Sequence, residues 1–272
     1  MDIVRNGGTK NLKLRALIDY ARESSIFYTP KDFPEKSTGE ALTRSSKEVK
    51  VEVTNEKTLD SVRRLEDAHM QQNICALNFA SAKHPGGGFR TGADAQEESL
   101  ARASALVTCV CGNPGYAWNR HNKCKHSGHL YSNHMTYSPR VPVFRNSDET
   151  LVRTQQEVRL VSFVSCAAPN RRAVTKCHEE EVKLVLENRM DRVLAVMALH
   201  QHTAIVLGAF GCGVFGNDAA QVASIFRRLL TSKYKNCFEH VVFAIYAPEK
   251  NSKAKKNLEA FKLEFADLLD AS

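Results

Sequence analysis

Apolar residues along the chain follow three spacings, and each spacing predicts an element. Short continuous apolar runs predict buried strands at 74–79, 158–166, 204–207 and 241–246. Alternation of apolar and charged residues predicts a half-buried strand at 49–53, and a shorter strand is expected at 141–144. Apolar residues at helical spacing predict helices at 11–25, 56–70, 96–110, 177–201, 219–230 and 257–269.

The predicted elements alternate between strand and helix, which indicates an α/β fold. Such an order favours parallel strands with helices on both faces of the sheet. Residues 26–44 and 111–140 lack either periodicity, and we expect them to be irregular. No internal repeat and no clear linker interrupts the chain. We therefore predict an N-terminal helical extension, residues 1–48, packed on a single unit formed by residues 49–272.

Composition limits the class of protein. The chain has 272 residues, and its hydrophobic fraction of 43% is ample for a packed core. It contains neither an apolar run long enough to cross a membrane nor an N-terminal apolar segment typical of a secretory signal. Eight cysteines without such a signal are expected to be reduced thiols. We expect an intracellular protein of the cytoplasm or nucleus that does not enter a membrane.

The formal net charge of +8 predicts attraction to polyanions. A nucleic-acid-binding protein is one alternative that this charge permits. That class is expected to carry basic residues with interleaved aromatic residues on one face. The basic residues here are scattered along the sequence, so the charge alone does not identify the polyanion.

The most informative stretch contains Gly86, Gly87 and Gly88. These glycines follow the predicted strand 74–79 and precede the helix that starts near Gln96. A strand, a glycine loop and a helix N-terminus form an anion site, because free N–H groups and the helix dipole face the loop. Acids in the first helical turn are also favoured by the helix dipole alone. Glu97 and Glu98 are thus either a charged helix start or catalytic carboxylates beside bound phosphates.

A second glycine loop, residues 208–217, lies between the strand 204–207 and the helix 219–230. Ligands of parallel α/β sheets bind beyond the carboxyl ends of the strands, so both loops are expected to face one ligand. Neither loop continues as the Gly-Lys-Ser/Thr of a nucleoside-triphosphate loop. The second loop partly matches the dinucleotide pattern but lacks the downstream acid, so an oxidoreductase is disfavoured.

Gly86-Gly-Gly88, seven further residues, and then Gln96-Glu-Glu98 resemble the signature of poly(ADP-ribose) glycohydrolases, in particular the small microbial-type branch. The second glycine loop and the segment from Ala168 to Asn170 are also similar to this family, and the resemblance spans about residues 49–265. It implies a macrodomain-like three-layer fold with a mixed, mostly parallel sheet flanked by helices. It also implies hydrolysis of ribose–ribose O-glycosidic bonds with release of ADP-ribose.

The resemblance also implies roles for single residues. Glu98 is expected to be the general acid and base, and Glu97 to bind ribose hydroxyls. Phe215 is expected to pack on the ribose beside the scissile bond; the alternative is an ordinary loop aromatic residue anchored in the core. Asn78 either contacts ribose or ties the end of its strand. The predicted substrate-binding residues are Asn78, Gly86, Gly87, Gly88, Gln96, Gly211, Cys212, Gly213, Val214, Phe215, Gly216 and Asn217.

The chemistry fits these residue types. Glycoside cleavage needs a proton for the leaving oxygen, and the conjugate base of the same acid can then activate water. Neighbouring residues on a helix project about 100° apart, so Glu97 and Glu98 are not the facing carboxylates of common glycosidases. The scheme requires no metal and no cofactor.

Cysteine and histidine residues are concentrated in one segment that is predicted to be irregular, and a structural zinc site is one interpretation of them. They are Cys109, Cys111, His121, Cys124, His126, His129 and His134. Their spacings differ from the usual zinc-binding pairs, and buried cysteines with incidental surface histidines are the simpler interpretation.

Two further classes remain open. One is a macrodomain that binds ADP-ribose without turnover, which has no need for an acid at the anomeric carbon. The other is a mono(ADP-ribosyl) hydrolase that acts on protein or DNA. In every case we expect ADP-ribose or its polymer as ligand, ADP-ribosylated proteins as partners, and a monomeric chain.

Overall fold

The computed structural model describes residues 9–32, 48–68, 73–122, 127–146, 148–174 and 178–269. One seven-stranded sheet, in the order β1-β4-β5-β3-β6-β7-β2, runs through this part of the chain. Its strands are β1 Ile26–Tyr28, β2 Lys50–Thr54, β3 Ile74–Phe79, β4 Met135–Val143, β5 Arg159–Cys166, β6 Ala204–Leu207 and β7 His240–Ala244.

Most neighbouring strands are parallel. β5, β3, β6, β7 and β2 pair in parallel, whereas β4 runs antiparallel to β5 and β1 runs antiparallel to β4. This confirms the mixed, mostly parallel sheet of a macrodomain-like α/β fold. The strand before the first glycine loop, β3, lies in the middle of the sheet.

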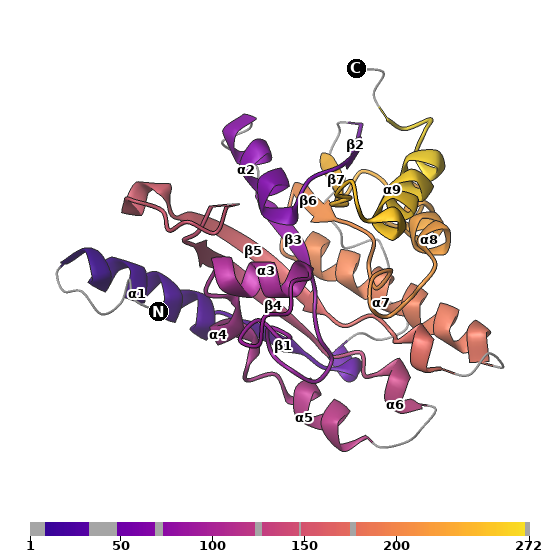
Figure 1. The fold of residues 1–272 in the computed structure, drawn as a ribbon, viewed down its shortest axis with the longest axis horizontal. Coiled ribbons are helices and arrows are strands. Elements are labelled where there is room, and N and C mark those ends of the chain that lie inside the picture. The colour runs from indigo at the N-terminus through magenta and orange to yellow at the C-terminus, as the bar shows by residue number, and fades with distance from the viewer. Residues whose placement is uncertain are drawn as a thin grey trace.

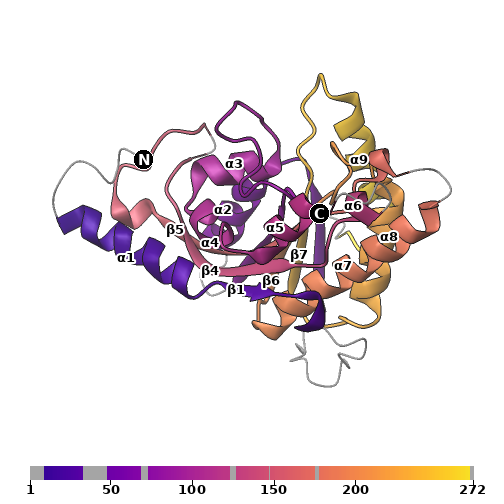
Figure 2. The same cartoon turned by 90° about the horizontal axis from the view of Figure 1, so that it is seen from below.

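Helices cover both faces of the sheet. The helices are α1 Thr9–Glu23, α2 Thr58–Ala68, α3 Gln96–Ala103, α4 Leu106–Val110, α5 Pro114–His121, α6 Ser127–Leu130, α7 Glu179–Leu199, α8 Ala219–Thr231 and α9 Ser252–Glu264, with 3-10 turns η2 Pro30–Asp32, η4 Gln155–Glu157 and η5 Arg171–Ala173. The first four helices lie on one side of the molecule, and α7, α8 and α9 lie on the other (Figures 1 and 2).

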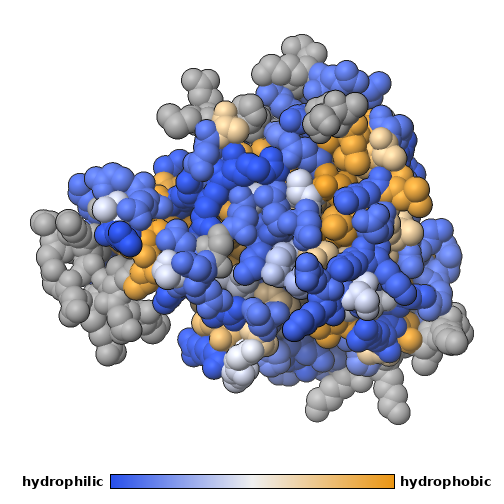
Figure 3. All heavy atoms as spheres, turned by 45° about the horizontal axis from the view of Figure 1, so that its top comes forward, coloured by the Kyte–Doolittle hydropathy of each residue, from blue (hydrophilic) through white to orange (hydrophobic). Residues whose placement is uncertain are grey.

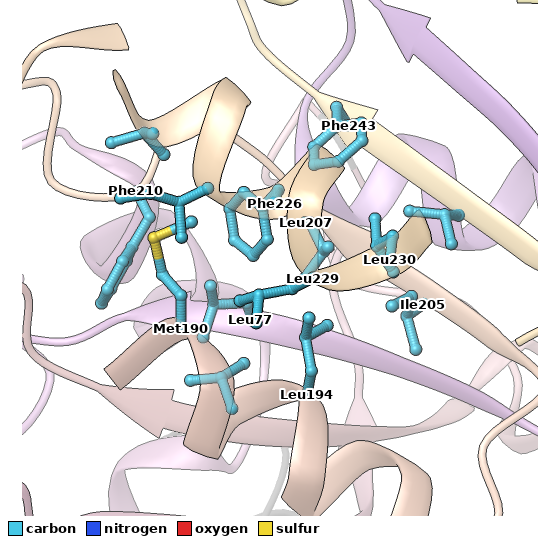
Figure 4. Close-up of a cluster of buried hydrophobic side chains, with 14 of the residues drawn as sticks. Leu77, Met190, Leu194, Ile205, Leu207, Phe210, Phe226, Leu229, Leu230 and Phe243 are labelled. Atoms are coloured by element: carbon cyan, nitrogen blue, oxygen red, sulfur yellow. The ribbon is translucent and has the colours of Figure 1, made fainter. Parts of the chain in front are cut away.

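Alternating residues of β3, β6 and β7 supply two cores. On β3, Cys75 and Leu77 belong to the core beneath α7, α8 and α9, whereas Ile74 and Ala76 belong to the core beneath α1 to α4. This alternation follows from the pleat of a strand, which sends successive side chains to opposite faces. Figure 4 shows the first core, where Leu77 lies among side chains from α7, α8, β6 and β7.

The apolar stripe predicted for α7 is confirmed. Its five positions, Val182, Leu186, Met190, Val193 and Met197, are all buried. The predicted strands 74–79 and 204–207 match β3 and β6 in both bounds. The last helix begins earlier than predicted, because the side chain of Asn251 caps it by accepting a hydrogen bond from the N–H of Ala254.

Three sequence-based expectations were wrong. Residues 26–28 form the edge strand β1 rather than a loop, and residues 111–140 contain α5, α6 and the start of β4 rather than irregular chain. The predicted helix 96–110 is two helices, because Ser104 is extended and bridges to Val143 of β4. The boundary predicted near residue 48 stays a prediction, because residues 33–47 lie outside the described residues.

Hydrophilic side chains cover most of the face drawn in Figure 3, and hydrophobic side chains form separate patches on it. Among the described residues, no helix has the length and apolar character needed to cross a membrane.

Candidate active site

A large cleft opens beyond the carboxyl ends of β3, β6 and β7, with a volume of about 1280 Å³. The two glycine loops and the segment after β7 line it, and the lining includes Glu97, Glu98 and Phe215. The structure therefore brings the two loops to one cleft, as expected from the strand order.

The first loop depends on glycine at the position closest to the acids. Gly86, Gly87 and Gly92 have positive φ angles of 76°, 61° and 87°. A β-carbon at Gly87 would lie 2.8 Å from Cδ of Glu98 and 3.1 Å from Oε2 of Glu97. Any side chain at residue 87 would therefore displace the carboxylates. We expected this glycine to make room for phosphate; in the structure it makes room for the acid pair.

Glu98 is held by backbone donors from the loop that precedes its helix. The N–H of Gly88 donates to Oε1 at 2.9 Å, and the N–H of Ala95 donates to Oε2 at 3.2 Å. The residue is 9% exposed, at the wall of the cleft. The loop thus fixes the carboxylate while leaving it in contact with the cleft.

Glu97 is more deeply buried than Glu98, and its carboxyl group accepts hydrogen bonds from a different set of backbone N–H groups. The N–H of Ser81 donates to Oε2 at 2.6 Å, and the N–H of Gly86 donates to Oε1 at 3.1 Å. Burial raises the pKa of Glu97 to about 8, and the charge of Glu98 contributes to the rise. At neutral pH the pair therefore holds a proton, which is the reagent that glycoside cleavage requires.

Gln96 ties the acid-bearing helix to the sheet. Its amide donates to the carbonyl of Leu77 at 2.8 Å and to Oγ1 of Thr58 at 3.1 Å, and its oxygen accepts from the N–H of Phe79 at 2.9 Å. Both amide hydrogens are used within the protein. Gln96 therefore positions the following acids, and its predicted contact with substrate stays a prediction.

Asn78 lies beneath the acids. It is fully buried, its amide donates to Oγ of Ser165 at 3.0 Å, and it also donates to Glu97. It is not among the residues that line the cleft. The structure thus shows Asn78 supporting the acid pair, and its contact with ribose stays a prediction.

The second loop is shaped by Gly211 and Gly216, which have φ angles of 72° and 71°. Asn217 closes the loop by donating to the carbonyls of Pro169 and Gly211, at 3.0 and 3.1 Å. Asp218 then caps α8 by accepting from the N–H of Gln221 at 2.9 Å. These hydrogen bonds join the end of the loop to Gly211 and to the segment after β5.

The predicted binding residues of this loop differ in exposure. Cys212 is fully buried, with a thiol pKa raised by burial, and Asn217 is 4% exposed. Val214 is 73% exposed, and Gly213 has open space beside its α-carbon. Gly213, Val214 and Phe215 line the cleft, whereas Cys212 does not, and its predicted contact with substrate stays a prediction.

Phe215 is half-buried between the core and the cleft. Its ring lies 5.7 Å, centroid to centroid, from the ring of Tyr131, and it also packs against the core beneath α7 to α9. Both interpretations drawn from the sequence therefore describe part of its surroundings. Sequence reasoning missed Tyr131, because this residue belongs to a stretch that was predicted to be irregular.

Tyr131 is in turn held by a buried arginine that we did not single out from the sequence. Arg189 of α7 is fully buried, and no acid among the described residues pairs with it. Its guanidinium donates to the carbonyls of Leu130, Tyr131 and Ala167 and to Oδ1 of Asn133. Burial lowers its pKa to about 10. A charged residue beside the apolar stripe of α7 was the only sequence signal.

The cysteine and histidine segment is spread over several elements. Cys109 is buried in a core, whereas Cys111 is exposed. In the part of the chain that the structure describes, no three His, Cys, Asp or Glu side chains are grouped as metal ligands. Cys124 and His126 lie outside the described residues, so the zinc hypothesis stays open.

Comparison with known proteins identifies the family of this chain. The model of the microbial-type poly(ADP-ribose) glycohydrolase (PARG) catalytic domain matches residues 3–146. The structure of PARG from Thermomonospora curvata is 40% identical, with a TM-score of 0.82 over 92% of this chain and 89% of that chain. This chain belongs to the microbial-type PARG family.

Two further structures carry ligands. PARG from Deinococcus radiodurans in complex with ADP-ribose is 38% identical, with a TM-score of 0.80 over 92% of this chain and 98% of that chain. The Thermomonospora curvata PARG bound to the inhibitor ADP-HPD has a TM-score of 0.79 and 40% identity over 92% of this chain and 88% of that chain. The comparison with curated proteins finds no match.

Proposed function

We propose that this chain is a poly(ADP-ribose) glycohydrolase, which hydrolyses ribose–ribose bonds of the polymer and releases ADP-ribose. Its membership of the microbial-type PARG family supports this activity. The observation that carries the proposal is the carboxyl pair at the wall of the cleft. Glu97 and Glu98 are fixed there by backbone N–H groups, in the space that Gly87 leaves open.

Glu98 acts as general acid and base in this proposal. Its carboxyl group protonates the leaving ribose oxygen, which relieves the developing negative charge as the glycosidic bond breaks. The carboxylate then takes a proton from water as that water attacks the anomeric carbon. The N–H groups of Gly88 and Ala95 hold the carboxylate in one orientation during both steps.

Glu97 has two roles in this proposal: it helps the acid pair to hold a proton, and it orients the ribose. Its raised pKa keeps a proton on the pair at neutral pH, and the mutual repulsion of two nearby carboxylates has the same effect. Glu97 orients the ribose through its hydroxyl groups in this proposal. Phe215 covers one face of that ribose, and the second glycine loop offers its backbone N–H groups to the diphosphate.

The test is incubation of the purified chain with poly(ADP-ribosyl)ated protein, followed by chromatography for free ADP-ribose. Release of ADP-ribose by the wild-type chain, but not by Glu98→Gln, is the expected result. A protein that binds ADP-ribose and releases none is a macrodomain without turnover, and this outcome would contradict the proposal. Release from mono(ADP-ribosyl)ated protein alone would identify a mono(ADP-ribosyl) hydrolase instead.

The remaining expectations from the sequence belong to the same proposal. ADP-ribosylated proteins are the expected partners, because the polymer is attached to them, and the chain is expected to act as a monomer. The six cysteines that the structure describes have free thiols, which supports a reducing, intracellular compartment.

A further inference from the structure

Two basic residues that do not line the cleft, Lys83 and Arg120, lie near Tyr131. The guanidinium of Arg120 donates to the carbonyl of Lys83 at 2.7 Å, which brings α5 and the first loop together. Nζ of Lys83 lies 6.0 Å from the centroid of the Tyr131 ring, and that ring packs against Phe215. The two cations are thus connected to Phe215 through Tyr131.

Two more basic residues, Arg172 and Lys253, contact the second glycine loop. The N–H of Arg172 donates to the carbonyl of Phe215 at 3.1 Å. The stem of Arg172 lies over the second loop, because a β-carbon at Gly216 would lie 2.6 Å from its Cγ. Nζ of Lys253 donates to the carbonyl of Gly213 at 2.6 Å.

We call Lys83, Arg120, Arg172 and Lys253 the basic arc. Among the described residues, no acid pairs with any of the four, whereas the neighbouring Arg171 pairs with Glu179 at 2.7 Å. Burial lowers the pKa of Lys253, and the charge of Arg172 lowers it further. The arc is therefore a concentration of unpaired positive charge around one end of the cleft, and such a surface attracts a polyanion.

We propose that the basic arc binds the diphosphate of the second ADP-ribose unit of the polymer, next to the unit held in the cleft. This inference rests on the proposed function and deepens it. The bond that Glu98 cleaves joins the unit in the cleft to the rest of the polymer. The rest of the polymer therefore leaves the cleft beside Glu98 and Phe215, where the arc begins.

Phosphate recognition fits the residues of the arc. Two of its members are arginines, whose planar guanidinium groups donate two parallel hydrogen bonds to phosphate oxygens. Arg120 and Arg172 are exposed, so their outer nitrogens are accessible. Free ADP-ribose fills only the cleft, so the arc discriminates the polymer from its product.

The test compares polymer and product in one set of variants. Arg120→Met/Arg172→Met removes both charges and keeps side chains of similar length, so the stem over Gly216 is retained. We expect kcat/KM for the polymer to fall by about tenfold or more, because each lost charge-assisted hydrogen bond to phosphate has a cost of this order. Calorimetry should give an unchanged Kd for free ADP-ribose.

Two variants serve as controls. Arg120→Lys/Arg172→Lys restores the charges and should recover most of the polymer activity. Lys13→Met removes an exposed charge on α1, and it should change neither measurement. The loss should also shrink as salt concentration rises, because contacts with phosphate are screened.

Three outcomes would overturn the inference. An unchanged kcat/KM of the double Met variant, with an active wild-type chain, rejects the arc and leaves the glycohydrolase proposal intact. A wild-type chain that releases no ADP-ribose rejects the glycohydrolase proposal, and the arc falls with it. Single-stranded oligoadenylate that competes for the wild-type chain as strongly as the polymer would make the arc a general nucleic-acid surface.

Discussion

Glu98 occupies the space that a side chain of residue 87 would fill. Gly87 is fixed in the left-handed region at a φ of 61°, and its missing β-carbon is what allows the carboxyl groups of Glu97 and Glu98 to approach the loop. The glycine triplet and the acids thus form one structural unit. The sequence spacing between them is the length of chain needed to bring the helix start back onto the loop.

Gly87→Ala should therefore disable catalysis. We expect the hydrolysis rate to fall by at least about a hundredfold, since displacement of a catalytic group by about 1 Å has an effect of this size. The measurement is release of ADP-ribose at saturating polymer, with the melting temperature recorded for the same protein.

Gly92→Ala is the matched control for this variant. Gly92 also has a positive φ, but a β-carbon there has open space around it. Backbone strain should cost about 1 kcal/mol of stability in both variants. Equal rates for the two variants would show that residue 87 affects strain only, and not the acids.

Glu98→Gln should abolish turnover and leave ADP-ribose affinity within about tenfold of the wild type, about 1.4 kcal/mol. The carboxyl group acts in the transition state, whereas the loops bind the ground state. Hydrolysis assays and calorimetry on one preparation separate the two effects. A near-normal rate for this variant would remove Glu98 from the mechanism.

The raised pKa of Glu97 predicts a dependence of stability on pH. Between 4.5 and about 8 the folded protein holds a proton that the unfolded chain has released. The free energy of unfolding should therefore fall as pH rises through this window.

Glu97→Gln should remove that contribution to the slope of stability against pH. Thermal unfolding from pH 5 to pH 9 provides the measurement. Glu249→Gln, at an exposed position beside the cleft, should keep the slope of the wild type. Parallel slopes for wild type and Glu97→Gln would contradict the assignment of the proton to this pair.

Phe215→Ala should lower the hydrolysis rate strongly and the melting temperature only slightly, because the ring is half-buried and faces the cleft. Phe226→Ala is the contrasting variant. Phe226 is fully buried between α8 and the sheet and does not line the cleft, and its truncation should cost about 3–5 kcal/mol of stability. If Phe215→Ala melts as early as Phe226→Ala and keeps a normal rate, Phe215 is a core residue.

Arg189→Met should destabilise the fold by about 3 kcal/mol, because several buried carbonyl oxygens lose their donor. Chemical denaturation measures this change. Lys183→Met, an exposed change on the same helix, should cost less than about 0.5 kcal/mol. A stability loss no larger than that of Lys183→Met would show that Arg189 is replaceable.

The sequence predicted those elements whose burial pattern lies within one segment and does not depend on a partner remote in sequence. The runs 74–79 and 204–207 are buried except at Phe79, so all of their residues other than Asn78 are apolar and the bounds are sharp. The edge strand β1 was missed because it is short and forms only when β4 lies beside it. Ser104 breaks a helical pattern for a similar reason, since its partner Val143 is remote in sequence.

The site also has a part that is visible in one stretch of sequence and a part that forms only on folding. Glu97, Glu98 and the glycine triplet lie within one window of sequence, so their relation was visible as a motif. The four residues of the basic arc come from distant segments and meet only in the folded chain. Asn78 and Gln96 lie beside the acid pair, and their contact with substrate stays a prediction. The sequence could not show that the NH₂ groups of both amides donate within the protein.

The central position of β3 has a consequence for local unfolding. Gln96 joins the acid-bearing helix to the carbonyl of Leu77 in this strand, and β3 has strands on both sides. Local unfolding of the edge strands β1 or β2 leaves the hydrogen bond between Gln96 and Leu77 in place. The amide protons of β3, including that of Phe79, which donates to Gln96, should therefore exchange only when the whole molecule opens, and inactivation by denaturant should coincide with global unfolding.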